Sequence, residues 1–340
     1  MKRNFLPVAL GAALGLAAAS AASATTLEDI QARGKLNCGV NTGLAGFLYV
    51  DDSGERQGFD AAYCRALAAA VLGDANAVEF TPLTSKNRFS ALASGEIDVL
   101  SRNTTWTFQR DADLKNTFIG VSYYDGQGFL VPKSLGVESA LELDGATICI
   151  QTGTTTELNV AEFFESNDIN FEPLPIETFT EAQQNYLAGA CDVYTTDASG
   201  LAATRATFEN PEEHLVLPEI ISKEPLGPLV RQGDEQWADI ARWTLNALII
   251  AEEKGITKEN AAEVAQSSKD PEVKRLLGTD GDYGAMVGLN NDFALKAIQA
   301  GGNYGEIFEQ YLGENTALGL ARGLNAQWKD GGLIFAPPFR

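Results

Sequence analysis

The strongest constraint on the fold is a regular alternation of short apolar runs and helix-like segments through the first 220 residues. Residues 35–40 (KLNCGV) and 77–83 (AVEFTPL) have the composition of strands, and residues 59–73 (FDAAYCRALAAAVLG) that of a helix ended by Gly73. Strands that alternate with helices form βαβ units around parallel sheets. The chain is therefore expected to be an α/β protein.

The pattern starts again after residue 144 and repeats in detail. Residues 88–103 (RFSALASGEIDVLSRN) and 182–197 (AQQNYLAGACDVYTTD) both have the pattern of a helix, a glycine and a strand that ends in polar residues. The chain also exceeds the ~100–200 residues of a single domain. We therefore expect two similar α/β lobes joined near residues 126–132, then a long helix over 237–254 and a largely helical remainder.

The first 24 residues have the pattern of a secretory signal peptide. Lys2 and Arg3 precede a short apolar segment at 5–19, and Ala-Ser-Ala at 22–24 is typical of a cleavage site before Thr25. The apolar segment is shorter than the ~20 residues of a membrane-spanning helix. We expect the mature protein to be exported in soluble form.

The charge balance limits the possible partners. The chain has 25 Lys+Arg and 46 Asp+Glu, so without Lys2 and Arg3 the mature chain has 23 against 46, a formal charge of −23. Binding to nucleic acid or to an anionic membrane surface needs a basic surface. We therefore expect no nucleic-acid partner.

Four cysteines in an exported chain favour disulfides. Of the three possible connectivities we prefer Cys38–Cys64 and Cys149–Cys191, because each bond then stays within one lobe. Four buried free thiols remain the alternative.

Enzyme motifs are absent from the sequence. The single histidine, His214, lies in a polar segment without an apparent partner for catalysis or metal binding, which favours a surface position. No G-x-S-x-G, H-E-x-x-H or P-loop spacing occurs. Catalysis by paired carboxylates stays open because acids are abundant. We expect no catalytic residue, no metal and no cofactor.

Polar residues follow the expected strands at the carboxyl ends, where ligands bind in open α/β sheets. The strand 146–152 leads through a threonine-rich turn into a helix, where Thr154, Thr155 and free N–H groups suit a carboxylate. Ordinary capping by a threonine is an equally good explanation.

Two further groups at strand ends carry charge. Asp197 is placed to hold an ammonium group or to cap the following helix. Arg110, with Asn103 and Thr105, is placed to grip a carboxylate bidentately or to pair with a neighbouring surface acid. Taken together, these groups complement a zwitterionic α-amino acid.

Several segments carry a resemblance to a known family. They are GFDAAYCRALAAAVLG, RFSALASGEIDVLSRNTTWTFQR, QTGTTTE, DVYTTD and GGNYGEIFEQYLGE. Over nearly the whole mature chain the protein resembles the periplasmic amino-acid-binding proteins of ATP-driven (ABC) uptake systems, the family 3 solute-binding proteins. The resemblance implies a type II periplasmic-binding-protein fold, in which two lobes with mostly parallel sheets close over a ligand, with a helical C-terminal extension.

The resemblance also implies roles for the strand-end residues. From the first lobe, the residues implied to bind the ligand carboxylate are Asn103, Thr105 and Arg110. From the second lobe, Thr154 with Thr155 beside it is implied to meet the same group, and Asp197 to take the ammonium.

The side-chain pocket is implied to involve the loop after the first strand, at Asn41 and Leu44. Asn41 replaces an aspartate of smaller relatives that prefer basic ligands, so a basic ligand is not implied. Arg102 facing the pocket would favour Glu, Asp, Gln or Asn as ligand, whereas an outward Arg102 is a surface residue, and both remain open. Trp106 packs either under the pocket or, as we favour, in the core.

The same resemblance sets the expected boundaries and partners. Lobe 1 comprises 25–126 and 227–340, lobe 2 comprises 131–222, and the segments 126–131 and 222–227 are hinges. Residues 255–297 have no counterpart in small members and point to the longer, general L-amino-acid subgroup. The expected partners are an L-amino acid and a membrane permease, for a monomer in the periplasm. An exported cyclohexadienyl dehydratase-like enzyme and a ligand-sensing module are the alternatives.

Overall fold

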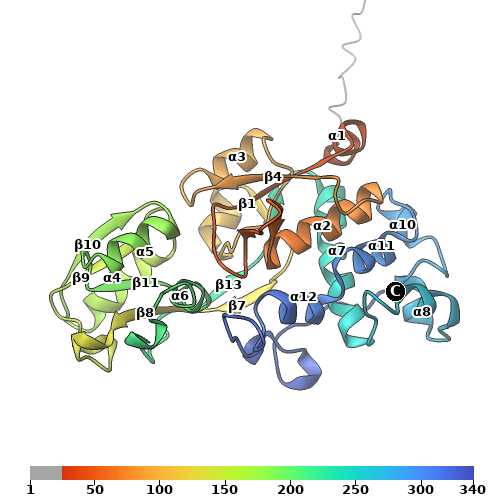
Figure 1. Cartoon of the computed structure of the whole chain (residues 1–340). Coiled ribbons are helices and arrows are strands. Elements are labelled where there is room, and N and C mark those ends of the chain that lie inside the picture. Colours follow the sequence, from red (N-terminus) through yellow and green to blue (C-terminus); the bar gives the residue numbers. More distant parts are fainter. Residues whose placement is uncertain (1–24) are drawn as a thin grey trace, which may run out of the picture.

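The computed structural model describes residues 25–340, which form two α/β lobes that lie side by side (Figure 1). Lobe 2 lies at the left of Figure 1, and lobe 1 with the C-terminal helices occupies the centre and right. The expected signal peptide, 1–24, lies outside the described residues.

Lobe 1 is built around a five-stranded sheet of order β4-β1-β5-β14-β6. Its elements before the chain crosses to lobe 2 are α1 (Thr26–Arg33), β1 (Leu36–Asn41), β2 (Tyr49–Val50), β3 (Arg56–Gln57), α2 (Phe59–Leu72), β4 (Val78–Leu83), α3 (Arg88–Ser94), β5 (Val99–Leu100), the π-helical turn η1 (Gln109–Asp113) and β6 (Asn116–Phe118). After its return the chain adds β14 (Leu229–Arg231).

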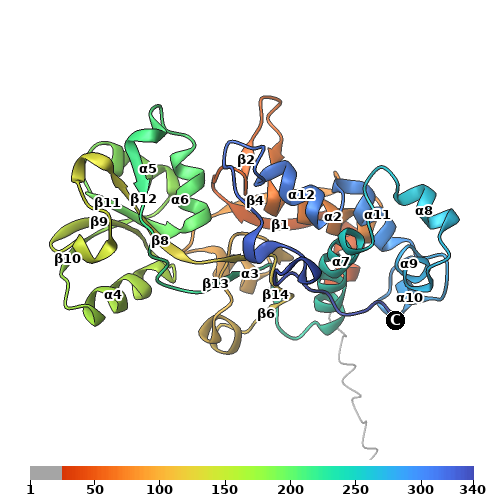
Figure 2. The ribbon, with the colours of Figure 1, turned by 90° about the horizontal axis from the view of Figure 1, so that it is seen from below.

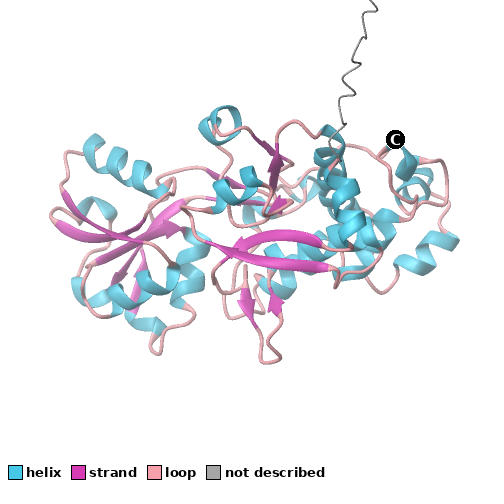
Figure 3. Ribbon diagram, turned by 90° about the horizontal axis from the view of Figure 1, so that it is seen from above, coloured by secondary structure: helices cyan, strands magenta, loops and turns pink. Residues whose placement is uncertain are grey.

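Lobe 2 repeats this plan with a sheet of order β10-β9-β11-β8-β12. Its elements are β8 (Gln127–Pro132), η2 (Lys133–Leu135), η3 (Ala140–Glu142), β9 (Ala146–Gln151), α4 (Thr156–Ser166), β10 (Phe171–Ile176), α5 (Phe179–Leu187), β11 (Val193–Asp197), α6 (Ala198–Arg205), η4 (Pro211–Glu213) and β12 (His214–Val216). The two sheets are seen in Figures 2 and 3.

Both sheets are mixed, whereas helix–strand alternation alone predicts mostly parallel ones. In each, three strands are parallel (β4, β1 and β5; β10, β9 and β11) and the fourth strand, β14 or β8, runs antiparallel to its neighbours. This fourth strand is the one by which the chain enters the lobe from the other lobe. It has no preceding crossover helix within its own sheet, so nothing forces it to be parallel.

The chain passes between the lobes through a two-stranded antiparallel ribbon. Its strands are β7 (Tyr123–Asp125) and β13 (Glu224–Leu226), which pair Glu224 with Asp125. Most of the segment 126–131, expected to be a hinge, lies in β8 of the lobe 2 sheet. The expected segment 222–227 contains β13 itself.

The C-terminal helices pack on lobe 1. They are α7 (Glu235–Glu253), α8 (Ala261–Ser267), α9 (Pro271–Leu276), α10 (Tyr283–Met286), α11 (Phe293–Gly301) and α12 (Tyr304–Tyr311), followed by η5 (Gly323–Asn325) and η6 (Trp328–Asp330). Helix α2 is buried on almost every side because its many alanines let α7 and α11 approach closely. This packing fixes the position of the α2 N-terminus, which supports the site described below.

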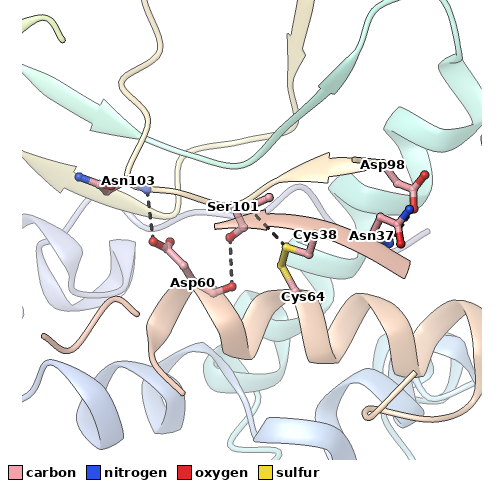
Figure 4. The surroundings of a disulfide bond; sticks show 8 residues. Asn37, Cys38, Asp60, Cys64, Asp98, Ser101 and Asn103 are labelled. Atoms are coloured by element: carbon pink, nitrogen blue, oxygen red, sulfur yellow. Dashed lines mark hydrogen bonds between the residues drawn. A yellow bond between two sulfur atoms is a disulfide. The ribbon is translucent and has the colours of Figure 1, made fainter. Parts of the chain in front are cut away.

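The structure pairs Cys38 with Cys64 and Cys149 with Cys191, the connectivity that the sequence favoured. The Cα atoms are 6.3 Å apart in the first pair and 5.6 Å apart in the second. Figure 4 shows the first bond joining β1 to α2. Each bond thus ties a strand of one sheet to an element of the same lobe.

Candidate functional site

A small polar cavity lies between the lobes, at the carboxyl ends of the parallel strands. Most of the ligand-binding residues expected from the sequence line this inner pocket: Arg102, Asn103, Thr105, Arg110, Thr154, Thr155 and Asp197. Asn41 and Leu44 do not line it. Asn41 supports the pocket from behind, because its side-chain amide donates to the Asn103 side-chain oxygen at 3.0 Å.

Asn103 turns the chain away from β5 and into the inner pocket. Its φ of 21° is unusual for any residue but glycine, and asparagine is among the side chains that tolerate such a turn best. The Asn103 N–H donates to the carboxylate of Asp60, the second residue of α2, at 3.2 Å (Figure 4). A buried acid of the α2 N-terminus therefore holds the turn that presents 103–105 to the pocket.

Arg110 is buried, and its guanidinium makes no ion pair with any of the described residues. One nitrogen donates to the Thr105 carbonyl at 2.8 Å, and the group lies 5.4 Å from the centre of the Phe89 ring. Burial lowers the pKa of Arg110, and the nearby Glu224 and Asp197 carboxylates oppose that shift. The surface pairing with a neighbouring acid that the sequence left open is not formed.

Arg102 is also fully buried and lines the inner pocket, which answers the question that the sequence left open about its direction. It donates to the Leu83 carbonyl at 2.9 Å and to the Ser85 hydroxyl at 3.0 Å. Both acceptors are neutral, so its charge is not neutralised by an ion pair in the described part of the chain.

Arg88, at the start of α3, is a third buried guanidinium in the same wall, and sequence reasoning missed it. It donates to the Thr104 hydroxyl at 3.2 Å and, across the cleft, to the Gly153 carbonyl at 3.3 Å. Its Nε is buried without any hydrogen-bond partner among the described residues. Burial, followed by the like charges of Arg102 and Arg110, holds the pKa of Arg88 well below its usual value.

The threonine turn of lobe 2 offers backbone N–H groups to the pocket. The Thr154 hydroxyl donates to the Gln151 carbonyl at 2.6 Å, and the Gly153 N–H donates to Glu157 at 2.7 Å. The N–H groups of Thr154 and Thr155 find no acceptor within the described residues. Because they lie at the N-terminus of α4, they face outward where the helix dipole favours an anion.

Asp197 ends β11 and stays free of the capping role that the sequence left open. The backbone N–H and hydroxyl of Ser199 donate instead to Asp125, which caps α6 from the crossing ribbon. The Asp197 carboxylate has no hydrogen-bond donor in the described part of the chain, and it lines the inner pocket. Burial, and then the nearby Asp125 and Glu224, raise its pKa well above the usual range.

Glu224 joins the two lobes beside the pocket. This carboxylate is 1% exposed and accepts from the hydroxyls of Thr105 in lobe 1 and Thr155 in lobe 2. Asn159 of α4 and Ser222 donate to its other oxygen, each at 2.7 Å. A hydroxyl has one proton, so neither threonine can donate its hydroxyl to a ligand while it is bonded to Glu224.

The inner pocket presents groups that bind anions from both lobes and one carboxylate that binds a cation. Guanidinium groups from lobe 1 and free N–H groups from lobe 2 favour carboxylates, while the unpartnered Asp197 favours a cation. The two lobes meet at the pocket, since Arg88 contacts Gly153 and Thr105 contacts Thr155 across the cleft.

A model of the bacterial extracellular solute-binding proteins, family 3, matches residues 36–269. The chain belongs to this family. It is 61% identical over 328 residues to the glutamate/glutamine/aspartate/asparagine-binding protein BztA of Rhodobacter capsulatus, covering 96% of this chain and 97% of that protein. It is 56% identical to the general L-amino acid-binding periplasmic protein AapJ of Rhizobium johnstonii, over the full length of both.

A solved structure is similar to this solute-binding protein over nearly its whole length. It is an ABC transporter periplasmic binding protein from Brucella ovis with glutathione bound, 53% identical, with a TM-score of 0.91. The match covers 94% of this chain and 100% of that chain. The expected two-lobed fold, family and longer subgroup are therefore confirmed.

Like its relatives, this solute-binding protein is a transport protein and not an enzyme. A more distant match, with 28% identity and a TM-score of 0.57, is an ancestral amino-acid-binding protein that is a precursor of cyclohexadienyl dehydratase. Within residues 25–340, no group of three or more His, Cys, Asp or Glu side chains could hold a metal. None of the helices in this range has both the length and the apolar character needed to cross a bilayer.

Two expectations about aromatic residues need correction. Trp106 is neither in the core nor under the pocket, because it is 39% exposed and stacks on Phe118 with ring centres 5.3 Å apart. His214 is not a plain surface residue, since its ring packs 4.6 Å from that of Phe208 and bonds the Tyr186 hydroxyl at 2.8 Å.

Proposed function

We propose that this solute-binding protein captures L-amino acids, above all those with acidic or amide side chains, for an ATP-driven importer. The relatives BztA and AapJ are a glutamate/glutamine/aspartate/asparagine-binding and a general L-amino-acid-binding protein, which supports this ligand class. The more specific support comes from the chain's own pocket.

The observation that carries the proposal is the presence of three buried guanidiniums opposite one free carboxylate. Arg110 is sufficient for the α-carboxylate that every amino acid has. Arg88 and Arg102 then remain for a second oxygen-bearing group, which Glu, Asp, Gln and Asn have in their side chains. The buried, unpartnered Nε of Arg88 would gain an acceptor from such a ligand.

The main-chain end of the ligand has a complementary partner for each group. Its carboxylate would lie between Arg110, the N–H groups of Thr105 and Thr154, and Asn103. Its ammonium would bind Asp197, whose carboxylate has no donor of its own. The hydroxyls of Thr105 and Thr155 donate to Glu224, so we assign carboxylate binding to the backbone N–H of Thr105 rather than to its hydroxyl.

Binding is coupled to closure in this proposal. Lobe 1 (25–126 and 227–340) and lobe 2 (131–222) would separate by bending near the segments 126–131 and 222–227, at the ends of the β7–β13 ribbon. Only the closed form lets one ligand touch Arg110 and Asp197 together. A ligand therefore stabilises closure through its higher affinity for the closed form.

Membership of the family supports the partners and the compartment that we propose. The protein would be exported, cut before Thr25 and released into the periplasm as a monomer. A membrane permease would then recognise the closed form and receive the ligand. Mass spectrometry of the mature protein tests the cleavage site, and a first residue other than Thr25 would revise it.

The glutathione in the Brucella ovis structure widens the candidate ligands. Glutathione begins with a glutamate joined through its side chain, so the ammonium and the α-carboxylate of that glutamate are free. The same groups of the inner pocket would therefore accept the head of a γ-glutamyl compound as well as free glutamate.

The direct test is calorimetry on protein that has been unfolded and refolded to remove any carried ligand. We expect one-to-one binding of several L-amino acids, with Glu, Gln, Asp and Asn the tightest. The Asp197→Asn variant should lose affinity for all of them, because an ammonium then meets a neutral partner. Absence of binding by any common L-amino acid would refute the proposal.

A second variant tests the assignment of the side-chain group. Arg88→Met should weaken glutamate by about 10–100-fold, the range of a hydrogen bond to a charged group, and glutamine by less. Arg65→Met is the matched control, because Arg65 also packs on a phenylalanine of lobe 1 but lies outside the inner pocket. Equal losses for glutamate and alanine would remove Arg88 from side-chain recognition.

A further inference from the structure

A second and larger cavity lies in the cleft between the lobes, outside the inner pocket. This outer chamber has a volume of about 310 Å³ and opens to solvent. One wall is the lobe 1 loop that includes Leu44 and Tyr49, and the other is formed by α5 and α6 of lobe 2. Its lining includes Gly43, Leu44, Val50, Thr180, Gln183 and Thr207.

The outer chamber and the inner pocket are continuous along both lobes. On the lobe 2 side, Phe179 lines both cavities. On the lobe 1 side, the Asn41 side chain joins them, because it donates to Asn103 of the inner pocket and accepts from the N–H of Gly43 in the outer chamber, each at 3.0 Å. A ligand anchored in the inner pocket therefore has an adjoining space along this path.

The chemistry of the outer chamber differs from that of the inner pocket. Among residues 25–340, no charged side chain lines it. The lobe 2 wall presents hydroxyl and amide groups, such as those of Thr180 and Gln183, and the lobe 1 wall presents apolar surface, such as Leu44 and Val50. An uncharged chain with peptide groups and small side chains matches these walls.

We infer that the outer chamber is a second subsite that holds an uncharged extension of the ligand, so that the protein binds γ-glutamyl peptides and amides as well as free amino acids. The inference rests on the proposed function, because the glutamyl head must be held by Arg110 and Asp197. The γ-carbonyl oxygen of that head would still accept from Arg88 or Arg102, and the extension would leave through the amide nitrogen into the chamber. A terminal carboxylate would lie toward the solvent side of the chamber.

Three ligands distinguish this arrangement on refolded wild-type protein: L-glutamate, γ-glutamylglycine and α-glutamylglycine. We expect γ-glutamylglycine to bind within about 10-fold of glutamate, because each additional contact is offset by ordering of the peptide. The α-linked isomer should bind at least about 100-fold more weakly, since its amide replaces the α-carboxylate that Arg110 holds.

Two variants fill the chamber from opposite lobes. Thr180 and Val50 are both exposed and have no side-chain hydrogen bond within the described residues, so Thr180→Trp and Val50→Trp leave the core intact. Each should weaken γ-glutamylglycine by at least about 10-fold and change glutamate by less than about twofold. Leu187→Trp, an exposed position at the end of the same helix α5 but outside the chamber, is the control and should change neither.

The outcomes separate the two proposals. Tight glutamate binding without γ-glutamylglycine binding overturns the second subsite and leaves the proposed function in place. Unchanged γ-glutamylglycine affinity in both tryptophan variants overturns it as well. If neither glutamate nor the dipeptide binds, both proposals fall together.

Discussion

The Glu224→Gln variant examines how the two lobes are held together beside the pocket. Glutamine keeps the size of the side chain and removes its charge. One oxygen of Glu224 accepts from Thr105 and Thr155, and the other from Asn159 and Ser222. These donors come from lobe 1, lobe 2 and the crossing segment.

The magnitude follows from these four hydrogen bonds. The glutamine oxygen can still accept from Asn159 and Ser222, but as a neutral acceptor, at a loss of about 1 kcal/mol for each bond. The new NH₂ group faces Thr105 and Thr155, whose hydroxyls must turn to accept from it. Removing a buried charge returns part of the loss, since its desolvation is no longer needed. We expect the free energy of unfolding to fall by about 2 kcal/mol.

Ligand affinity should fall as well, because in the proposed closure the bonds between lobe 1 and lobe 2 at Glu224 would form only in the closed form. A loss of about 1–2 kcal/mol in the closed form alone weakens glutamate about 5–30-fold in calorimetry. Glu219→Gln is the matched control, since Glu219 accepts from Ser139 and Ala140 within lobe 2 only. If Glu224→Gln binds glutamate as tightly as the wild type, Glu224 does not hold the closed form.

Three other predictions concern stability. Burial raises the pKa of Asp60 to about 7, so its protonated form stabilises the fold, and this contribution is lost as the pH rises from about 4 to about 7. In urea unfolding, the wild type should lose at most about 4 kcal/mol of unfolding free energy over that range relative to Asp60→Asn. A difference between the two proteins that stays constant with pH would contradict this prediction. Replacing both Cys149 and Cys191 by alanine should lower the free energy of unfolding by about 4 kcal/mol, because the bond closes a loop across a sequence separation of 42; a loss below about 1 kcal/mol would argue against the loop-entropy account. Gly227→Ala should lower the free energy of unfolding by about 1–3 kcal/mol or more in thermal unfolding, since its Cβ would lie 1.9 Å from the Gly120 carbonyl oxygen. Gly301→Ala is the control and should be neutral or stabilising, because its Cβ would make only ordinary contacts at 3.9 Å.

The local pattern of the sequence was enough to predict the two lobes and most of the pocket wall. Helix and strand periods depend on neighbouring residues, so α2, β4 and β11 could be placed within a few residues of their observed bounds. Because strand ends converge at one edge of a sheet, the sequence alone predicted that Arg110 and Asp197 lie in the same site.

Arg88 shows where this reasoning stops. In the sequence it is an ordinary first residue of a helix, and no periodicity distinguishes it from Arg65. Its role depends on the approach of Gly153, 65 residues later in the chain and on the other lobe. The one available signal was a charged residue that begins a short and otherwise uncharged helix, RFSALAS.

What the sequence by itself determined about this protein is its fold, its family and the chemical types that face the ligand, because these follow from local periods, motifs and strand ends. Only the tertiary structure decided which groups remain free to bind. Asp197 is available because Asp125 caps α6, and the hydroxyls of Thr105 and Thr155 are occupied because both donate hydrogen bonds to Glu224. Each hydrogen-bond donor serves a limited number of acceptors, and that competition is settled between residues far apart in the chain.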